Sequence, residues 1–169
     1  MRAGIALGSN LGDRLGPLTA ARETILHLNR VTPPFLASSV YETEPVNCEA
    51  DAPNFLNAVI ELSYEGEPLQ LFQDLRAIEG DLGRPSVHQR NVSRSIDIDL
   101  LYFDDVLVIT EQLVLPHPRM AERRFVLQPL ADIQPNRILP GQTKTIRELL
   151  ASAPQLAKVE RAISQWGHL

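Results

Sequence analysis

The chain has 169 residues, 44% hydrophobic and 22% charged, with a formal net charge of −5, as is typical of a soluble globular protein. Its length predicts a single domain, residues 1–169, with a sizeable core. The acidic balance argues against a broad nucleic-acid surface, no apolar run approaches the roughly 18 residues of a membrane span, and the start of the chain does not resemble a secretory signal.

The first half of the chain predicts strands and helices in alternation. Apolar residues recur at helical spacing after Pro17 and after Pro68, and proline is well tolerated in the first turn of a helix. The expected elements are a strand over 2–7, a helix from Pro17, a break over 31–34, a strand over 35–41, a polar loop over 42–54, a strand over 57–64 and a helix from Pro68.

The second half predicts two further strands and helical additions. A strand over 94–103 is followed by the pair Asp104-Asp105, which we expect to turn the chain back into a hairpin strand over 106–109. A helical stretch is expected over 119–133, and Thr145 with Glu148 has the spacing of a capping box before a last helix. This order predicts an α+β fold, a ferredoxin-like sandwich with a mainly antiparallel sheet and helices packed on one face.

Asp97 and Asp99 are the most informative residues of the chain. They alternate with Ile96, Ile98 and Leu100, so that a strand would direct both carboxylates to one face, about 6–7 Å apart. Two adjacent anions repel each other unless a positive charge lies between them, and oxygen ligands suit magnesium. The pattern therefore favours a metal site, with a solvated polar strand face as the alternative.

The segment just before this strand is cationic. Residues 84–94 include Arg84, Arg90, Arg94 and His88 and no acidic residue, against the negative net charge of the chain. Arginine binds phosphate oxygens, and carboxylates hold the metal that bridges them. The combination predicts a phosphate-and-metal site, with a loop that is Arg-rich only for solubility as the alternative.

A second cluster of donors follows at 116–123. His117 lies between two prolines, which limits the directions in which it can point, and Arg123 follows six residues later. The glycine-bearing turn at 8–13 lacks the Gly-Lys-Ser/Thr ending of a phosphate-binding loop. If a nucleotide binds, its phosphates must be held by arginine, histidine and metal.

Several short motifs together resemble one known family, over roughly residues 3–133. They are Gly8-Ser9-Asn10-Leu11-Gly12, Tyr41-Glu42-Thr43-Glu44-Pro45, Phe55-Leu56-Asn57-Ala58, Gly83-Arg84, Arg94-Ser95-Ile96-Asp97-Ile98-Asp99 and Pro116-His117-Pro118-Arg119-Met120 with Arg123 and Phe125. In this order they resemble the 6-hydroxymethyl-7,8-dihydropterin pyrophosphokinases of folate biosynthesis. The resemblance implies a ferredoxin-like fold and transfer of pyrophosphate from ATP to the pterin hydroxymethyl group, releasing AMP.

The resemblance also implies roles for individual residues. Asp97 and Asp99 match the ligands of two Mg²⁺ ions and, with Arg84 and Arg94, the catalytic residues. The residues that would contact ATP are Glu79, Arg84, Arg94, Ile98, His117, Pro118 and Arg123. The residues that would contact the reduced pterin are Thr43, Pro45, Val46, Phe55, Asn57 and Phe125, with the two phenylalanines stacking on the ring. The family's three mobile loops correspond to Gly8–Arg14, Thr43–Pro53 and Arg84–Arg94.

The chain departs from the family pattern at a few positions. Ser86 stands where a second arginine is usual, and 91–93 lacks the usual tryptophan and Gly-Pro. Glu44 replaces a common proline, and Arg76 lies where a glutamine often contacts the nucleotide. We expect these changes to affect the loop and the ATP contacts rather than the metal pair or the pterin pocket.

Two alternatives stay open from the residues alone. One is another two-metal enzyme on a ferredoxin-like scaffold, such as a nucleotidyl transferase or cyclase, and the other is a non-catalytic ligand-binding regulatory domain. Magnesium-dependent formation of AMP would separate all three. We expect a cytoplasmic protein, because the single cysteine, Cys48, fits a reducing compartment, and a monomer that binds neither nucleic acid nor membranes.

Overall fold

The computed structural model of the protein describes residues 1–45, 51–83 and 95–166. The strands are β1 (Arg2–Ser9), β2 (Val31–Ala37), β3 (Val40–Thr43), β4 (Phe55–Tyr64), β5 (Asp97–Phe103), β6 (Val108–Ile109), β7 (Val114–Leu115) and β8 (Val159–Ile163). The helices are α1 (Leu15–Leu26), α2 (Pro68–Asp81), α3 (Arg124–Ile133) and α4 (Ile146–Ser152), with a 3-10 turn at Met120–Glu122.

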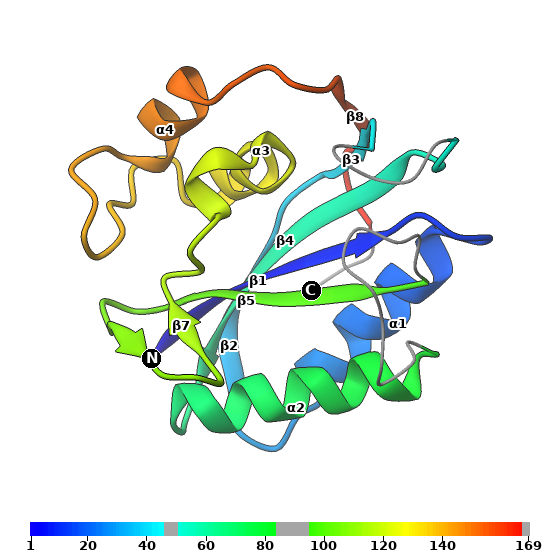
Figure 1. The fold of residues 1–169 in the computed structure, drawn as a ribbon. Coiled ribbons are helices and arrows are strands. Elements are labelled where there is room, and N and C mark those ends of the chain that lie inside the picture. Colours follow the sequence, from blue (N-terminus) through cyan, green and yellow to red (C-terminus); the bar gives the residue numbers. More distant parts are fainter. Residues whose placement is uncertain (46–50, 84–94, 167–169) are drawn as a thin grey trace.

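Within the described residues, one antiparallel sheet organises the molecule (Figure 1). Its strands follow the order β5-β1-β4-β3-β8. The strand β2 also pairs with β4, along residues 60–64, whereas β3 pairs with residues 55–57. The central pair is β1 and β4, which match continuously from Arg2 with Ser63 to Ser9 with Leu56. The mainly antiparallel α+β fold expected from the sequence is therefore confirmed.

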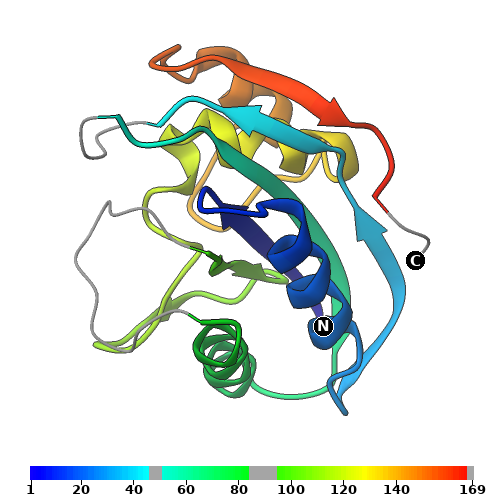
Figure 2. The same cartoon turned by 90° about the vertical axis from the view of Figure 1, so that its right-hand side faces the viewer.

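Helices cover both faces of this sheet (Figure 1, Figure 2). Alternate residues of β1 separate the two cores, since Ile5 and Leu7 pack with α1 and α2 while Ala6 packs with α3 and α4. Residues of β4 divide in the same way, with Ile60 on the first side and Val59 on the second. The expectation that all helices pack on one face is wrong, because both faces carry apolar side chains that need cover.

The helix signals of the sequence are reproduced in the structure. Pro17 lies in the first turn of α1, and Pro68 is the first residue of α2. At α4 the Thr145 side chain accepts a hydrogen bond from the Glu148 N–H at 3.3 Å, and the Glu148 carboxylate accepts one from the Thr145 N–H at 2.8 Å. The predicted capping box is confirmed.

Three strand predictions need correction. The single strand expected over 35–41 is two strands, β2 and β3, and β2 begins at Val31, inside the expected break. The turn at Asp104 does not return the chain along β5, because β6 pairs with β7 instead. The strand β8 was not predicted. It pairs with β3, and no short-range pattern reveals a partner more than a hundred residues away.

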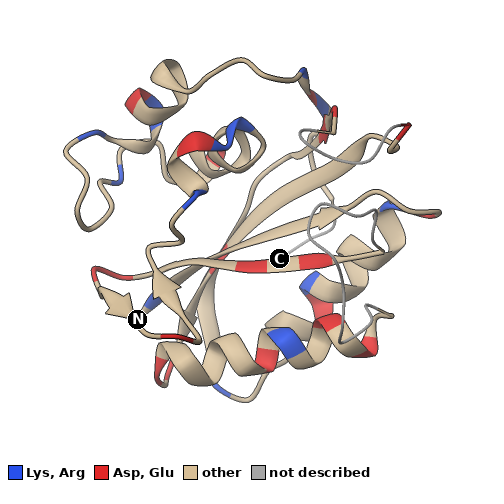
Figure 3. Ribbon diagram, viewed as in Figure 1, with Lys and Arg blue, Asp and Glu red and all other residues tan. Residues whose placement is uncertain are grey.

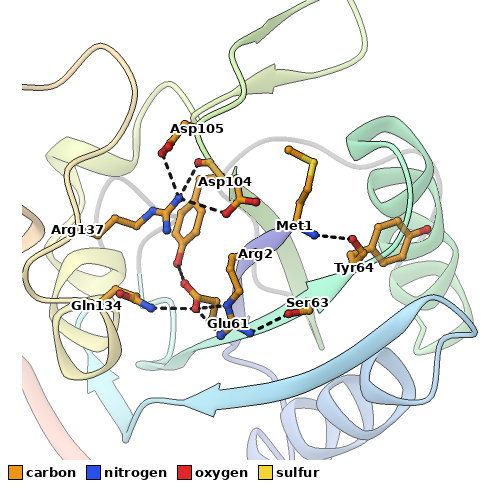
Figure 4. Close-up of polar contacts among 10 residues, drawn as sticks. Met1, Arg2, Glu61, Ser63, Tyr64, Asp104, Asp105, Gln134 and Arg137 are labelled. Atoms are coloured by element: carbon orange, nitrogen blue, oxygen red, sulfur yellow. Dashed lines mark hydrogen bonds and ion pairs between the residues drawn. The ribbon is translucent and has the colours of Figure 1, made fainter.

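A buried carboxylate ties the start of the chain to the helical additions (Figure 4). Glu61 on β4 is fully buried, and its Oε1 lies 2.5 Å from Arg2 Nη2 and accepts a hydrogen bond from Gln134 Nε2 at 2.9 Å. The Tyr102 hydroxyl donates a hydrogen bond to the other carboxylate oxygen of Glu61, Oε2. Burial, reinforced by the adjacent Glu61, raises the pKa of Tyr102 well above its ordinary value, so the phenol remains a donor.

The end of the described chain packs back onto the core. Trp166 is buried, its Nε1 donates to the Ser38 carbonyl at 3.0 Å, and the Arg22 guanidinium lies 4.8 Å from its ring centroid.

Among the helices described, none has the length and apolar character needed to cross a membrane.

Candidate active site

The candidate site lies where four strands meet at one end of the sheet. In the strand register Gly8 is opposite Asn57 on one side and Asp97 on the other, and Asn57 is opposite Tyr41 on β3. Because neighbouring strands are antiparallel, the end of β1 and the beginnings of β4 and β5 arrive at the same edge. Positions far apart in the sequence are thereby brought side by side.

Gly8 leaves space between the two flanking side chains. A Cβ atom at this position would lie 2.9 Å from the Asn57 Oδ1 and 3.9 Å from the Asp97 Cβ. The first contact is closer than real Cβ atoms tolerate, so any larger residue would displace the Asn57 amide. The sequence predicted Gly8 as part of a turn, whereas it belongs to β1 and shapes the site.

Asp97 and Asp99 lie together on the face of β5 that looks toward α3, as the sequence predicted. Their neighbours Ile98 and Leu100 are buried in the core on the opposite face. The acidic positions near the start of β5 are red in Figure 3. Both carboxylates line a small open cavity, shared with Ala6, Leu7, Gly8, Asn57, Ala58, Phe125 and Val126.

Two donors predicted to contact phosphate approach Asp99. The Arg123 Nη1 lies 3.7 Å and the His117 Nε2 3.9 Å from Asp99 Oδ2. His117 is held by its backbone N–H, which donates to the Leu101 carbonyl at 2.8 Å, and its Nδ1 accepts from the Arg119 N–H at 3.3 Å. The Nδ1 acceptor role places the ring proton on Nε2, which faces the carboxylate.

The charge of His117 follows from its surroundings. Burial lowers the pKa of His117, and the nearby Arg123 and Arg119 lower it further, while Asp99 raises it. The pKa of His117 is therefore below its ordinary value of 6.5, which favours the neutral ring at pH 7 in the free protein. A neutral imidazole offers a phosphate oxygen one N–H donor without adding a charge.

The pterin residues predicted on β3 and β4 are joined directly. Asn57 is buried, and its Nδ2 donates to the Thr43 Oγ1 at 2.7 Å, which fixes the direction of the amide. Phe125, near the start of α3, lines the same cavity, and the Arg123 guanidinium lies 5.5 Å from its ring centroid. Phe55 begins β4, opposite Thr43, but does not line this cavity.

Glu79 connects α2 to the start of β5. Its buried Oε1 accepts a hydrogen bond from the Ile98 N–H at 2.7 Å, and its Oε2 lies 2.5 Å from Arg76 Nη1. Arg76, the departure noted in the sequence, is thus an ion-pair partner of Glu79. The side chain of Ile98 is buried in the core on the side of the sheet that α1 and α2 cover, so only its backbone lies at the edge of the strand.

The remaining predicted residues divide into two groups. Pro45 is half-buried next to β3, and Pro118 is exposed beside His117. Val46, Arg84 and Arg94 lie outside the described residues, together with Cys48 and the rest of the loop 84–94.

The donor set suits magnesium. No group of three or more His, Cys, Asp or Glu side chains that could hold a metal occurs in the described parts of the chain. Mg²⁺ is commonly bound by one or two carboxylates, with substrate phosphates and water filling the other positions. Asp97 and Asp99, on one strand face and lining an open cavity, match that requirement.

Comparisons with known proteins point to one family. The profile of the 7,8-dihydro-6-hydroxymethylpterin-pyrophosphokinase (HPPK) family matches residues 4–135. The chain is 44% identical over 129 residues to the 2-amino-4-hydroxy-6-hydroxymethyldihydropteridine pyrophosphokinase of Bacillus subtilis, covering 76% of this chain and 75% of that protein. The Haemophilus influenzae protein of the same name is 36% identical over 146 residues, covering 86% of this chain and 89% of that protein.

Solved structures show the same fold. Wild-type HPPK-DHPS of Plasmodium falciparum, crystallised with pteroate, superimposes with a TM-score of 0.68 at 14% identity. The match covers 89% of this chain but only 44% of that chain, so the chain spans less than half of this solved relative. At this identity the likeness concerns the fold alone.

Proposed function

Since the chain belongs to the 7,8-dihydro-6-hydroxymethylpterin-pyrophosphokinase family, it is an ATP-dependent pyrophosphokinase of folate biosynthesis, and we propose that the site described above performs the reaction. The pterin hydroxymethyl oxygen attacks the β-phosphorus of ATP. The bond from that phosphorus to the oxygen shared with the α-phosphate breaks, and AMP leaves as the hydroxyl loses its proton. The products are the pterin diphosphate and AMP.

We propose that Asp97 and Asp99 hold two Mg²⁺ ions together with the triphosphate. Bound there, magnesium supplies neutralisation of the phosphate charge and polarisation of the attacking hydroxyl. Arg123 and the neutral His117 contribute donors beside Asp99, 3.7 Å and 3.9 Å from its Oδ2. Phosphoryl-type transfer depends mainly on positioning and charge stabilisation, which these groups can supply without a covalent intermediate.

The rest of the ATP site is proposed from the family pattern and its surroundings. Arg84 and Arg94 would grip the triphosphate from the cationic loop. Glu79 and the backbone of Ile98 would contact the nucleotide at the start of β5, and Pro118 would do so beside His117. The Glu79–Ile98 hydrogen bond supports this assignment by fixing the strand that carries both aspartates.

The pterin would bind on the other side of the same cavity. The Asn57 amide, oriented by Thr43, offers hydrogen bonds to the polar edge of a bicyclic ring, and Pro45 and Val46 would contribute nearby backbone. Phe125 and Phe55 would stack on the two faces of the ring. These residues come from β3, β4 and α3, so the pocket exists only when the helix is packed on the sheet.

One observation carries the assignment: Asp97 and Asp99 line the same cavity as Asn57 and Phe125. A phosphate-and-metal site is thereby next to a site for a flat heterocycle. Neither a nucleotidyl transferase nor a regulatory ligand-binding domain requires both halves, and these alternatives have no comparable support.

The test is an assay of the purified protein with ATP, 6-hydroxymethyl-7,8-dihydropterin and Mg²⁺. We expect equal amounts of AMP and pterin diphosphate, and no product when EDTA removes the metal. Formation of ADP with a pterin monophosphate, or release of free pyrophosphate, would contradict the proposal.

We further propose that a single cytoplasmic chain is sufficient for activity. Both proposed halves of the site, with Asp97 and Asp99 on one side and Asn57 and Phe125 on the other, line one cavity within a single chain, and the single cysteine in the sequence suits a reducing compartment. Light scattering under the assay conditions should give the mass of a monomer. Loss of specific activity when the protein is diluted would instead argue that a second copy of the chain is needed.

A further inference from the structure

The cavity proposed for the pterin depends on the position of α3. Phe125 lines the cavity at the beginning of this helix, while Asn57 lines it from the sheet. Asp132 lies seven residues after Phe125, two turns along the helix, and therefore on nearly the same face. Asp132 therefore contacts the sheet from the same side of α3 as Phe125.

Asp132 makes its contacts with β3 and the residues just before it. One carboxylate oxygen, Oδ2, accepts a hydrogen bond from the Ser39 N–H at 3.1 Å. The Tyr41 hydroxyl donates to the carboxylate, 2.9 Å from Oδ1 and 3.0 Å from Oδ2. Charge-assisted bonds of this kind are directional, so the helix is held in one place along the strand as well as against it.

Tyr41 belongs to the same strand that orients Asn57. Tyr41 is opposite Asn57 in the register, and Thr43, two residues further on the same face, accepts the hydrogen bond from Asn57 Nδ2. Asp132 thus holds α3 to β3, and β3 holds the Asn57 amide. The positions of Phe125 on α3 and of Asn57 on β4 are thus both linked to β3.

The C-terminal strand completes these contacts. Arg161 on β8 donates from Nη2 to the Tyr41 hydroxyl at 3.3 Å, and the same atom lies 3.6 Å from Asp132 Oδ1. Beyond Thr43 the pairing continues, since the Glu44 N–H donates to the Lys158 carbonyl at 3.2 Å. A proline at position 44 would have no N–H for this bond. The strand β8 lies outside residues 4–135, the part matched by the family profile.

We propose that Asp132, Tyr41 and Arg161 form a positioning cluster, which holds Phe125 and Asn57 in the relative positions that let a pterin stack on the Phe125 ring while its polar edge hydrogen-bonds to the Asn57 amide. The proposal rests on the proposed function, because it takes this cavity as the pterin site. None of the three residues lines the cavity. They act through α3 and β3, and their effect is on pterin affinity rather than on the chemical step.

The first test compares three hydroxyl or carboxylate variants by calorimetry, using a pterin analogue in the presence of a non-hydrolysable ATP analogue and Mg²⁺. Tyr41→Phe and Asp132→Asn should each weaken pterin binding about tenfold and raise its KM, with a smaller change in kcat. Tyr64→Phe is the matched control, because the Tyr64 hydroxyl donates to Asp74 Oδ2 at 3.1 Å on the opposite face of the sheet. It should lose similar stability and leave pterin affinity unchanged.

A double-mutant cycle shows whether the cluster acts through Phe125. When Phe125→Ala is combined with Tyr41→Phe, the loss of pterin affinity should be clearly smaller than the product of the two single losses, since a misplaced ring cannot be lost twice. Multiplicative losses would overturn the proposal.

Arg161→Lys, which keeps a cation near Tyr41, should restore most of the affinity that Arg161→Gln loses.

The outcomes separate this inference from the function on which it rests. If Phe125→Ala leaves pterin binding unchanged, the cavity is not the pterin site and the proposed function fails at that point. If Phe125→Ala weakens binding but Tyr41→Phe and Asp132→Asn bind as the wild type does, only the positioning role is overturned. Circular dichroism establishes whether each variant is folded. If Asp132→Asn does not fold, the pterin affinity of Tyr41→Phe decides whether the positioning role holds.

Discussion

At the scale of single residues, the site is organised around two carboxylates on one strand face. Asp97 and Asp99 both line the cavity, and Arg123 lies 3.7 Å from Asp99 Oδ2. Two carboxylates side by side on one strand repel each other. The proposed metal ion with its bound phosphates would balance their charge, so we expect the pair to be required for activity and dispensable for folding.

The first prediction concerns these carboxylates. Asp97→Ala or Asp99→Ala should abolish turnover, while the melting temperature stays the same or rises slightly because mutual repulsion is removed. Asp105→Ala is a suitable control, since Asp105 is 89% exposed and pairs with Arg137 outside the site. Near wild-type turnover of either site variant at saturating Mg²⁺ would show that the metal assignment is wrong.

The second prediction concerns the aromatic faces. Phe125→Ala or Phe55→Ala should weaken binding of a pterin analogue by about 1–3 kcal/mol, the contribution of one lost stacking face. Affinity for the ATP analogue, titrated alone, should change much less. Calorimetry measures both, and unchanged pterin affinity in both variants would exclude a ring held between Phe55 and Phe125.

At the scale of elements, α4 illustrates how a local signal becomes a stabilising contact. Thr145→Ala removes the side-chain acceptor of the Glu148 N–H and should lower the free energy of unfolding by about 1 kcal/mol. Urea unfolding measures this change, and Thr24→Ala on α1, an exposed threonine away from any helix start, is a control with a smaller expected loss. Equal stability of both variants would mean that the cap does not contribute.

The same cap predicts a pH dependence. The hydrogen bonds from the Thr145 N–H and hydroxyl lower the pKa of Glu148 below its ordinary value of 4.5. A lowered pKa in the folded state means that the stabilisation is complete above pH 4.5 and is lost as the pH falls through the lower, folded value. The stability difference between the wild type and Glu148→Gln should therefore shrink below pH 4.5. Thermal unfolding at several pH values checks the direction.

At the scale of the whole molecule, long-range contacts join the two ends of the chain to the sheet. Arg2 pairs with the buried Glu61 (Figure 4). Trp166 packs against Arg22 and donates a hydrogen bond to the Ser38 carbonyl. The first contact joins residues 59 positions apart, and the bond from Trp166 to Ser38 joins residues 128 positions apart. They support the prediction that residues 1–169 form one cooperative domain.

A direct test uses the chain's only tryptophan. Trp166 is buried against the core, so its fluorescence reports the packing of the C-terminal segment, while far-UV circular dichroism reports the sheet and helices. The two urea transitions should coincide if the chain unfolds as one unit. A fluorescence transition at clearly lower urea would show that the segment carrying β8 and Trp166 unfolds separately.

The sequence by itself determined the parts of the fold that depend on local patterns. Helical spacing and proline placement identified α1 and α2, the capping box identified the start of α4, and alternation identified β4 and the orientation of Asp97 and Asp99. Periodicity and capping act within a few residues, so they can be recognised without knowing the partner of a segment. The motifs with their fixed order were also enough to suggest the family, which the comparisons confirm.

Only the tertiary structure decided how distant segments meet. The pairing of β8 with β3, the pairing of β6 with β7, and the division of the helices between two faces depend on which apolar surfaces are left to cover. The bond from Glu79 to Ile98 and the space beside Gly8 arise only once the strands are in register. Residues alone predict chemistry within a segment, whereas a site built from β3, β4, β5 and α3 exists because folding places those segments at one end of one sheet.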